Sequence, residues 1–139
     1  MIKIYTDGAC SGNPGPAGCG AVIIYPDKRE FHMSQYLGDN LTNNIAELNA
    51  ILLSVQSLTN VSKEVPIEIY SDSQYSIGVL TKNNAIKNKE LIQKTKAVLA
   101  KFNHVKFIKV KGHSTDHYNN LADNLATESI RKHKLKNYL

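Results

Sequence analysis

The 139-residue chain contains no tryptophan, only two cysteines and no long hydrophobic run. A membrane-spanning helix needs about 20 consecutive apolar residues, so none is predicted and we expect no membrane partner. The N-terminus has a single lysine and leads at once into an expected strand, unlike a secretory signal. Cys10 and Cys19 form no CxxC motif, so neither a zinc site nor a disulfide framework is predicted, although a Cys10–Cys19 pair stays open. A reducing, cytoplasmic setting fits this cysteine usage best.

Acidic residues are outnumbered by basic ones. The chain has 12 aspartates and glutamates and 17 lysines and arginines, which gives a net charge of +5. The lysines concentrate between Lys82 and Lys111, where Glu90 is the one acidic residue. Such a basic stretch suits a polyanionic partner such as nucleic acid. A solvated helix face explains the same pattern, so charge alone does not decide. At this length we expect one domain over residues 1–139, with a sizeable core.

One short pattern occurs twice in the chain. Ile2–Asp7 and Ile67–Asp72 both alternate apolar and polar residues, as β-strands do, and both end on an aspartate. Adjacent strands lie about 4.8 Å apart, so Asp7 and Asp72 nearly touch if the two strands are parallel neighbours. Two carboxylates at so short a distance require a proton or a cation between them. A metal site at the C-terminal edge of a sheet is one interpretation; the other is that each aspartate begins a turn or caps the next element.

The rest of the chain predicts an α/β fold. Gly8 to Gly20, rich in glycine, proline and asparagine, is expected to be a loop, and residues 132–139 a frayed tail. The expected strands are 2–7, 21–25, 30–37, 67–72 and 105–110, and the expected helices are 44–58, 73–82, 88–102 and 119–133. This order predicts a mixed five-stranded sheet, with an antiparallel hairpin on one side and parallel strands on the other, flanked by helices.

Two further acids border the apolar stripes of predicted helices. Glu47 lies in the first turn of its helix and Asp123 in the first turns of the last helix, so both can point toward the sheet. Each also has an ordinary explanation. Asn44 and Glu47 resemble a capping box, and an acid near a helix N-terminus complements the helix dipole.

Five motifs in order give the chain a resemblance to a known family. They are Asp7–Gly15, Thr42-Asn43-Asn44 with Glu47, Asp72–Tyr75, Lys111–Ser114 and Ala122-Asp123. Over about residues 2–130 the chain resembles type 1 ribonuclease H. The resemblance implies an enzyme that hydrolyses the RNA strand of RNA–DNA hybrids with Mg²⁺, or with Mn²⁺ as a substitute. It also implies that His113 is a mobile catalytic histidine near the scissile phosphate, and that the catalytic, metal-binding carboxylates are Asp7, Glu47, Asp72 and Asp123.

This chemistry suits these residue types. Mg²⁺ is a hard ion that binds oxygen. Two ions about 4 Å apart can hold a phosphate between the attacking water and the leaving 3′-oxygen, which leaves 5′-phosphate and 3′-hydroxyl ends. Asp7 is expected to bridge the two ions. A loop histidine that titrates near neutrality, such as His113, can move a proton or ease product release, and a surface histidine without a role is the alternative.

Substrate recognition is expected to use short polar side chains, because amides and hydroxyls can bind the 2′-hydroxyls of RNA in a wide minor groove. The resemblance assigns that groove to Asn13, Asn43, Asn44 and Gln74. It assigns a phosphate of the DNA strand to Thr42 and Asn88, and a deoxyribose to Tyr75. Turn and cap duties are the ordinary explanation for Asn43 and Asn44.

The chain also departs from the family. Family members often place tryptophan in the channel for the DNA strand, which here must be built differently. Many carry a basic protrusion, for which the segment from Tyr75 to Asn88 is too short, and the position of a phosphate-binding arginine is Asn40. We therefore expect hybrid binding that is weaker and more sensitive to salt than in relatives with the protrusion. Activity on RNA duplexes stays open.

Four functions compete on this sequence. The first is hybrid cleavage by a monomeric enzyme. The others are a hybrid-binding module with little or no catalysis, a nuclease domain of a larger protein such as a reverse transcriptase, and a related nuclease that acts on DNA. The complete set of acids with His113 disfavours the second. The start at Met1, directly before a strand, favours a free-standing protein over the third, and the amide-rich groove disfavours the fourth.

Overall fold

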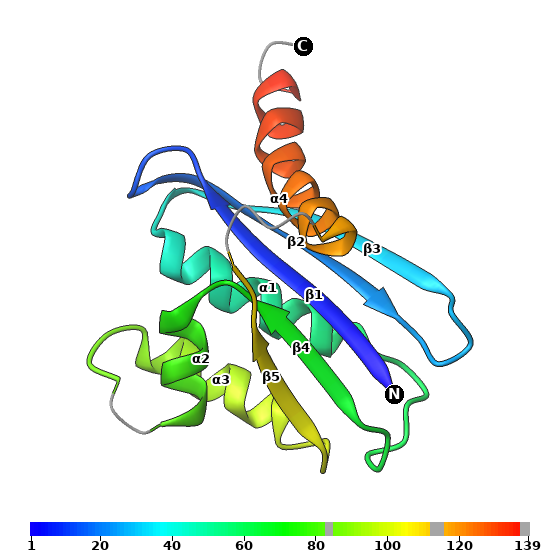
Figure 1. Ribbon diagram of the computed structural model, residues 1–139. Helices are drawn as coiled ribbons and strands as arrows, with labels where there is room; N and C mark the ends of the chain where they lie inside the picture. The colour runs from blue at the N-terminus through cyan, green and yellow to red at the C-terminus, as the bar shows by residue number, and fades with distance from the viewer. Residues whose placement is uncertain (83–84, 112–115, 137–139) are drawn as a thin grey trace.

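The computed structural model describes residues 1–82, 85–111 and 116–136. Its centre is a five-stranded sheet with the strand order β3-β2-β1-β4-β5 (Figure 1). β1, β2 and β3 pair antiparallel, and β1, β4 and β5 pair parallel, so the predicted mixed sheet is confirmed. The elements are β1 (Ile2–Cys10), β2 (Gly15–Ile24), β3 (Glu30–Leu41), α1 (Asn43–Gln56), β4 (Ile67–Ser71), α2 (Gln74–Thr81), α3 (Lys89–Leu99), β5 (Val105–Lys109) and α4 (His117–Lys136).

The β1–β2 hairpin is longer than the sequence predicted. Residues 8–10 continue β1 and pair with residues 17–19 of β2, so the loop expected from Gly8 to Gly20 is reduced to the hairpin tip. Glycines in this hairpin allow a helix to pack closely on the strands, as well as allowing the chain to turn. A Cβ on Gly20 would lie 2.6 Å from the Ala126 nitrogen of α4, so the helix packs directly on the backbone of β2. β3 also runs on to Leu41, past its predicted end at residue 37.

Two helix ends differ from the prediction. The N-cap of α1 is Thr42, whose hydroxyl accepts a hydrogen bond from the Ile45 N–H at 3.3 Å. The predicted capping box between Asn44 and Glu47 is therefore wrong, because a threonine hydroxyl caps the helix two residues earlier. α4 continues to Lys136, so residues 132–136 are helical where the sequence predicted a frayed tail.

Helices cover both faces of the sheet. α1 packs on one face with α3 beside it, and α4 crosses the other face over β1, β2 and β3 (Figure 1). The main core fills the space between α1 and the sheet, where burial of each large aliphatic side chain contributes about 1.5–3 kcal/mol. Its fully buried members include Ile4, Ile23, Leu48, Ile51 and Ile69. The predicted apolar stripe of the first helix therefore faces the sheet.

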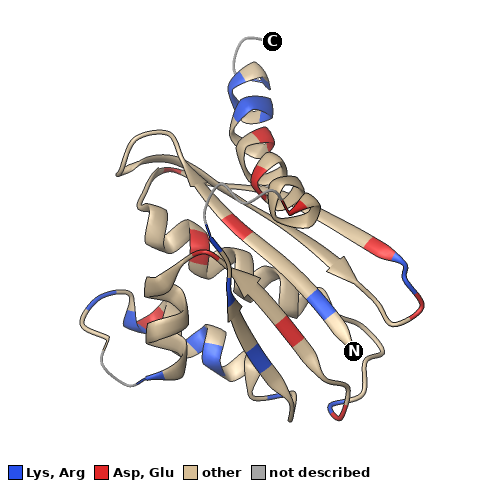
Figure 2. Ribbon diagram, viewed as in Figure 1, with Lys and Arg blue, Asp and Glu red and all other residues tan. Residues whose placement is uncertain are grey.

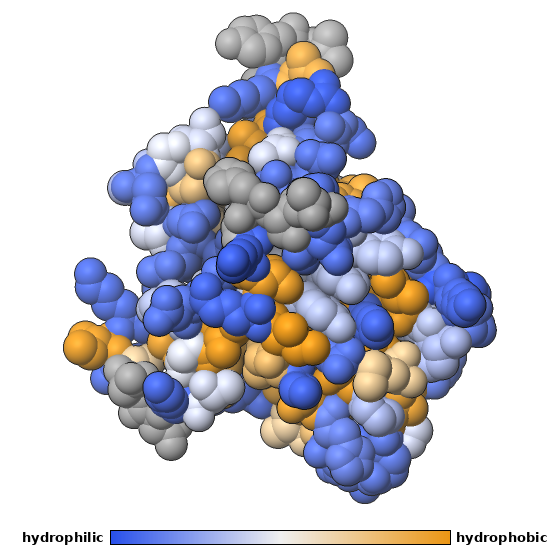
Figure 3. All heavy atoms as spheres, viewed as in Figure 1, coloured by the Kyte–Doolittle hydropathy of each residue, from blue (hydrophilic) through white to orange (hydrophobic). Residues whose placement is uncertain are grey.

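The face that carries α4 is covered over only part of its width. Figure 3 shows apolar atoms between polar ones over β4 and β5, beside the region that α4 covers. A smaller cluster of Tyr5, Val22 and Ala122 lies between α4 and the sheet, with Tyr70 and Tyr118 packed against it. Among the described residues, no helix combines the length and the apolar character needed to cross a membrane.

Candidate active site

The two strands that precede the aspartates are parallel neighbours, as predicted. Tyr5 of β1 pairs with Tyr70 of β4, so Asp7 and Asp72 each lie two residues past the same paired position. With Glu47 of α1 they offer oxygens that all lie within 4.8 Å of one another. Figure 2 shows acidic residues on β1, on α1 and on the helix that crosses β1. The sheet and α1 together bring three of the four predicted carboxylates into one cluster.

Glu47 reaches the two aspartates from α1. It is only 4% exposed, and its oxygen Oε2 is buried without a hydrogen-bond partner among the described residues. The close approach of α1 depends on Gly8, because a Cβ there would lie 2.5 Å from the Glu47 backbone nitrogen. A buried carboxylate oxygen without a donor costs free energy unless the group holds a proton or binds a cation.

Burial and repulsion between the carboxylates raise two pKa values in this cluster. Burial, reinforced by the charges of Asp7 and Asp72, raises the pKa of Glu47 to about 10. Burial, reinforced by the charge of Asp72, raises the pKa of Asp7 to about 7. Glu47 therefore holds a proton at neutral pH as long as no cation compensates the three carboxylates.

Asp123 approaches the cluster from α4. The cross-strand partner of Asp7 is Gly20, over which α4 packs closely. The charge of Asp123 contributes to the raised pKa of Asp7, after burial and the charge of Asp72. Asp123 is exposed and lies outside the set of oxygens within 4.8 Å. It therefore borders the cluster on the Asp7 side and does not complete its centre.

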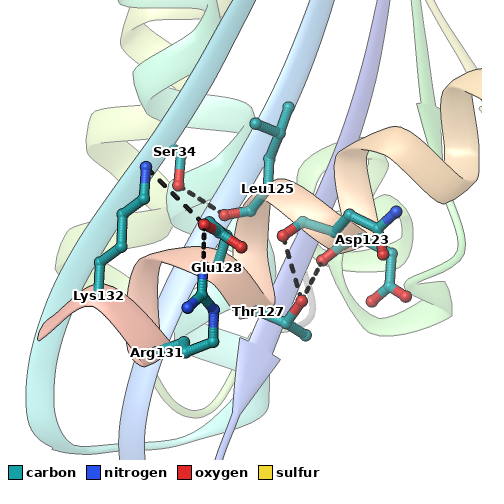
Figure 4. Close-up of polar contacts among 8 residues, drawn as sticks. Ser34, Asp123, Leu125, Thr127, Glu128, Arg131 and Lys132 are labelled. Carbon is teal, nitrogen blue, oxygen red and sulfur yellow. Dashed lines mark hydrogen bonds and ion pairs between the residues drawn. The ribbon is translucent and has the colours of Figure 1, made fainter. Parts of the chain in front are cut away.

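Figure 4 shows how α4 presents Asp123. The Asp123 carbonyl oxygen accepts a hydrogen bond from the Thr127 hydroxyl at 3.2 Å, within the helix. The Ser34 hydroxyl of β3 donates to the Leu125 carbonyl at 2.6 Å and so ties the helix to the sheet. The carboxylate of Asp123 points away from this network (Figure 4). Packing therefore anchors the helix backbone and leaves the carboxylate available to a ligand.

The donor set fits a hard divalent cation. Mg²⁺ and Mn²⁺ prefer oxygen ligands, and the cluster consists of carboxylates. The partnerless Oε2 of Glu47 is the oxygen that a cation would satisfy. Asp7, Glu47 and Asp72 are positioned to hold such an ion, and Asp123 is positioned to extend the site.

Four of the predicted substrate residues gather at the start of α1. The side-chain oxygen of Asn13, in the hairpin tip, accepts a hydrogen bond from the Asn43 N–H at 3.0 Å. Thr42 caps the helix, and Asn43 and Asn44 are exposed on its first turn. Asn13 and Thr42 thus have structural duties of their own, while the side chains of Asn43 and Asn44 face solvent.

The other three predicted substrate residues gather around α2. The Asn88 side-chain amide donates to the Tyr75 hydroxyl at 3.0 Å. Asn88 adopts the left-handed conformation, with φ 60° and ψ 30°, which asparagine tolerates better than most residues. Gln74 and Tyr75 line a pocket of about 470 Å³ whose other wall residues are Gly78, Val79, Ala85, Ile86 and Lys87.

The last predicted catalytic residue, His113, lies outside the described residues.

The sequence interpretation missed Gly8 and Gly20, which let α1 and α4 approach Asp7. Their signal was the group of glycines between residues 8 and 20, which indicated a loop because glycine in a turn and glycine under a helix look alike in sequence.

Comparisons with known proteins identify the family. The RNase H family model matches residues 1–131. The chain is 40% identical to the ribonuclease H of Caldanaerobacter subterraneus subsp. tengcongensis, over 99% of this chain and 95% of that protein. It is 41% identical to the ribonuclease H of Clostridium botulinum, over 93% of this chain and 95% of that protein. The crystal structure of LC11-RNase H1 in complex with an RNA/DNA hybrid matches with a TM-score of 0.79 and 27% identity, over 96% of this chain and 99% of that chain. The chain therefore belongs to the ribonuclease H family of nucleases.

Proposed function

We propose that this enzyme is an endonuclease that cuts the RNA strand of RNA–DNA hybrids, with divalent cations held by Asp7, Glu47, Asp72 and Asp123. The observation that carries the proposal is the buried Oε2 of Glu47, which has no partner among the described residues and belongs to a carboxylate cluster 4.8 Å across. The choice of substrate is supported by LC11-RNase H1, which was crystallised with an RNA/DNA hybrid.

The four carboxylates are proposed to have different roles in holding the cations. When bound, two Mg²⁺ ions, or Mn²⁺ in their place, supply an activated water and stabilise the leaving 3′-oxygen, which gives 5′-phosphate and 3′-hydroxyl ends. Oxygens of Asp7, Glu47 and Asp72 lie within 4.8 Å of one another, and the charge of Asp123 also acts on Asp7, so Asp7 would bridge the two ions. Glu47 and Asp72 would hold the inner side of the site, and Asp123 would hold the outer side. Glu47 gives up its proton when it becomes a ligand.

His113 is proposed to act at the scissile phosphate. Its place in the Lys111–Ser114 motif, a few residues before α4, supports a role close to Asp123. An imidazole that titrates near neutral pH can take up or release a proton as the product leaves.

Substrate selection is proposed to come from the polar residues at the start of α1 and around α2. Side-chain amides of Asn13, Asn43, Asn44 and Gln74 would contact 2′-hydroxyls, which distinguish RNA from DNA. Thr42 and Asn88 would hold a phosphate of the DNA strand, and Tyr75 would pack against a deoxyribose. Lysines on α3 and in the segment before it (Figure 2) would supply the salt-dependent part of binding.

We further propose that residues 1–139 form one domain that acts as a monomer in the cytoplasm. The main core cluster, which joins the sheet to α1, α2 and α3, supports one folding unit. Sedimentation at micromolar concentration, with and without hybrid, tests the monomer.

Cleavage of a hybrid labelled on the RNA strand tests the function. Wild type is compared with Asp72→Asn, which removes one negative ligand and nearly keeps its shape, at several Mg²⁺ and Mn²⁺ concentrations. We expect Asp72→Asn to lose more than about a hundredfold in turnover, because replacing even residues that support a metal ligand costs about 10- to 100-fold. The matched control is Asp27→Asn, an exposed turn aspartate paired with Arg29, which should cut like wild type.

Other outcomes point to the competing functions. Folded wild type that binds hybrid but cuts no substrate with either ion would be a hybrid-binding module. Cutting of a DNA duplex in place of the hybrid would make the chain a DNA nuclease. Near-normal cleavage by Asp72→Asn would remove the carboxylate cluster from the mechanism.

A further inference from the structure

Three tyrosines form one aromatic stack that joins three elements of the fold. The rings of Tyr5 and Tyr70 are parallel, with centroids 4.3 Å apart and an interplanar angle of 10°. Tyr5 also meets Tyr118, with centroids 5.2 Å apart and a tilt of 31° between the rings. The tyrosine stack, made of Tyr5, Tyr70 and Tyr118, therefore connects β1, β4 and α4.

Each of these three elements also carries, or leads into, one carboxylate of the proposed metal site. Tyr5 lies two residues before Asp7 and Tyr70 two residues before Asp72. Because side chains alternate along a strand, Tyr5 shares a sheet face with Asp7, about 7 Å away along β1, and Asp72 follows directly after β4 ends at Ser71. Tyr118 lies five residues before Asp123 on α4. Glu47, the fourth acid, is held separately by the packing of α1 on Gly8.

Tyr118 is fixed at the beginning of α4 from several sides. Its hydroxyl donates to the Glu30 carboxylate of β3 at 3.2 Å. Its backbone N–H donates to the Asp116 carboxylate at 2.9 Å, which also accepts from the Asn119 N–H at 3.1 Å. A helix is stiff over a turn or two, and five residues rise about 7.5 Å, so the position of Asp123 follows from the position of Tyr118.

The acids of the cluster work against this arrangement. Asp123 and Asp72 both act on Asp7 by charge repulsion. Without cations this repulsion pushes the start of α4 away from β1. Gly20 permits the close approach of α4 but exerts no attraction, since it has no side chain. Stacking between aromatic rings stabilises their contact beyond the area that they bury, and this attraction opposes the repulsion.

We propose that the tyrosine stack positions the outer half of the metal site, and that Tyr118 is the positioning residue that holds Asp123 close to Asp7. The inference rests on the proposed function, because it assigns a task to the stack only if the acids bind cations. Tyr118 does not touch the cation or the substrate; it acts through Asp123.

Metal binding to the purified protein, followed by calorimetry with Mn²⁺ and with Mg²⁺, tests the proposal. We expect Tyr118→Ala to weaken cation affinity at least about tenfold, as loss of a residue that orients a ligand does. Tyr118→Phe keeps the ring and loses only the bond to Glu30, so it should restore most of the affinity. If Tyr118→Ala does not fold, as judged by circular dichroism, Tyr118→Leu removes the ring but keeps apolar bulk at this half-buried position.

Two further variants separate positioning from general stability. In an Asp123→Asn background, Tyr118→Ala should weaken affinity no further, because the two residues act in series. Tyr36→Ala is the matched control. Tyr36 of β3 stacks on His133 near the other end of α4, with centroids 3.7 Å apart and an angle of 5°, so its loss should lower stability and leave cation affinity unchanged.

The outcomes separate this inference from the proposed function. Wild type that binds neither cation would overturn the proposed function. Wild type that binds cations, together with a folded Tyr118→Ala of equal affinity, would overturn only the positioning role. Equal losses from Tyr118→Ala and Tyr36→Ala would also overturn it, because the effect would then belong to helix docking in general.

Discussion

Asp7 and Gly20 are opposite each other in the antiparallel ladder of β1 and β2. Asp7 contributes a carboxylate to the acid cluster. Gly20 has no side chain, so α4 packs directly on its backbone. A Cβ on Gly20 would come within 2.6 Å of the Ala126 nitrogen and 2.7 Å of Leu125 Cβ. Gly20 therefore sets how closely α4, and with it Asp123, approaches Asp7.

We predict that Gly20→Ala lowers both stability and activity. The added methyl group has no space, so α4 must shift, at a cost of about 1–3 kcal/mol of unfolding free energy. The same shift moves Asp123 away from Asp7, so cleavage should need more Mg²⁺. Urea unfolding and a Mg²⁺ titration of hybrid cleavage measure the two effects.

The control for this prediction is Gly78→Ala. Gly78 lies inside α2, and a Cβ there meets nothing within 4 Å. Alanine should therefore raise the unfolding free energy, by about 0.5–1 kcal/mol, because it is the better helix former. Stability equal to wild type in Gly20→Ala would contradict the close packing of α4 on β2.

Stability of the metal-free protein is predicted to fall as pH rises from about 4 to about 10, and most steeply below about pH 7, where both Asp7 and Glu47 contribute. Burial, with repulsion from neighbouring acids, raises the pKa of Asp7 from 3.8 to about 7 and that of Glu47 from 4.5 to about 10. A carboxyl with a raised folded-state pKa stabilises the fold fully below its unfolded pKa and loses that contribution as pH rises toward the folded pKa. The loss is at most about 1.4 kcal/mol per pH unit and group. Urea unfolding in the presence of a chelator measures it.

Asp7→Asn isolates the source of that pH dependence. The variant should match wild type near the lower end of this pH range and exceed its stability at neutral pH, because one repelling charge is gone. Glu128→Gln, a surface acid of α4 paired with Arg131, should keep the wild-type profile. Parallel profiles for Asp7→Asn and wild type would show that the acid cluster does not strain the fold.

Cation binding is predicted to release a proton. Glu47 holds one at neutral pH because its pKa is raised by burial, and a ligand carboxylate must be ionised. Calorimetry with Mg²⁺ in two buffers of different ionisation enthalpy should report release of about one proton from Glu47 and part of another from Asp7, whose pKa is raised to about 7. Glu47→Gln should remove the larger part of the release, and Glu128→Gln should leave it unchanged. Binding without proton release would mean that Glu47 is already ionised.

Hybrid binding is predicted to depend on the lysines around α3. Lys87 and Lys89 are exposed beside Asn88. If both contact phosphates, changing both to glutamine should make the slope of log affinity against log salt shallower by about 1 for each lysine. Lys63→Gln, in the connection before β4, is the control and should keep the wild-type slope. An unchanged slope in the double variant would place the binding charges elsewhere.

Part of this site could be predicted from the sequence because its signals are local. Alternation along Ile2–Asp7 and Ile67–Asp72 predicted two strands, and the repeat of the pattern predicted the matched aspartates. The apolar stripe after Glu47 predicted that α1 packs on the sheet. These inferences hold because strand and helix periods depend on neighbouring residues.

Other features were decided only by the tertiary structure. The extent of the β1–β2 hairpin, the N-cap at Thr42 and the helical end of α4 depend on partners distant in sequence. The tyrosine stack is another such case, since nothing in the spacing of Tyr5, Tyr70 and Tyr118 shows that their rings meet.

By itself the sequence determined which acids are present, the order of the helices and strands, and the face that each of them buries. The tertiary structure decided distances, because these follow from how closely the elements pack. Gly8 and Gly20 show the difference. Glycine at either position permits a turn or a close contact. Here both glycines allow a close contact, because α1 packs against Gly8 and α4 packs against Gly20.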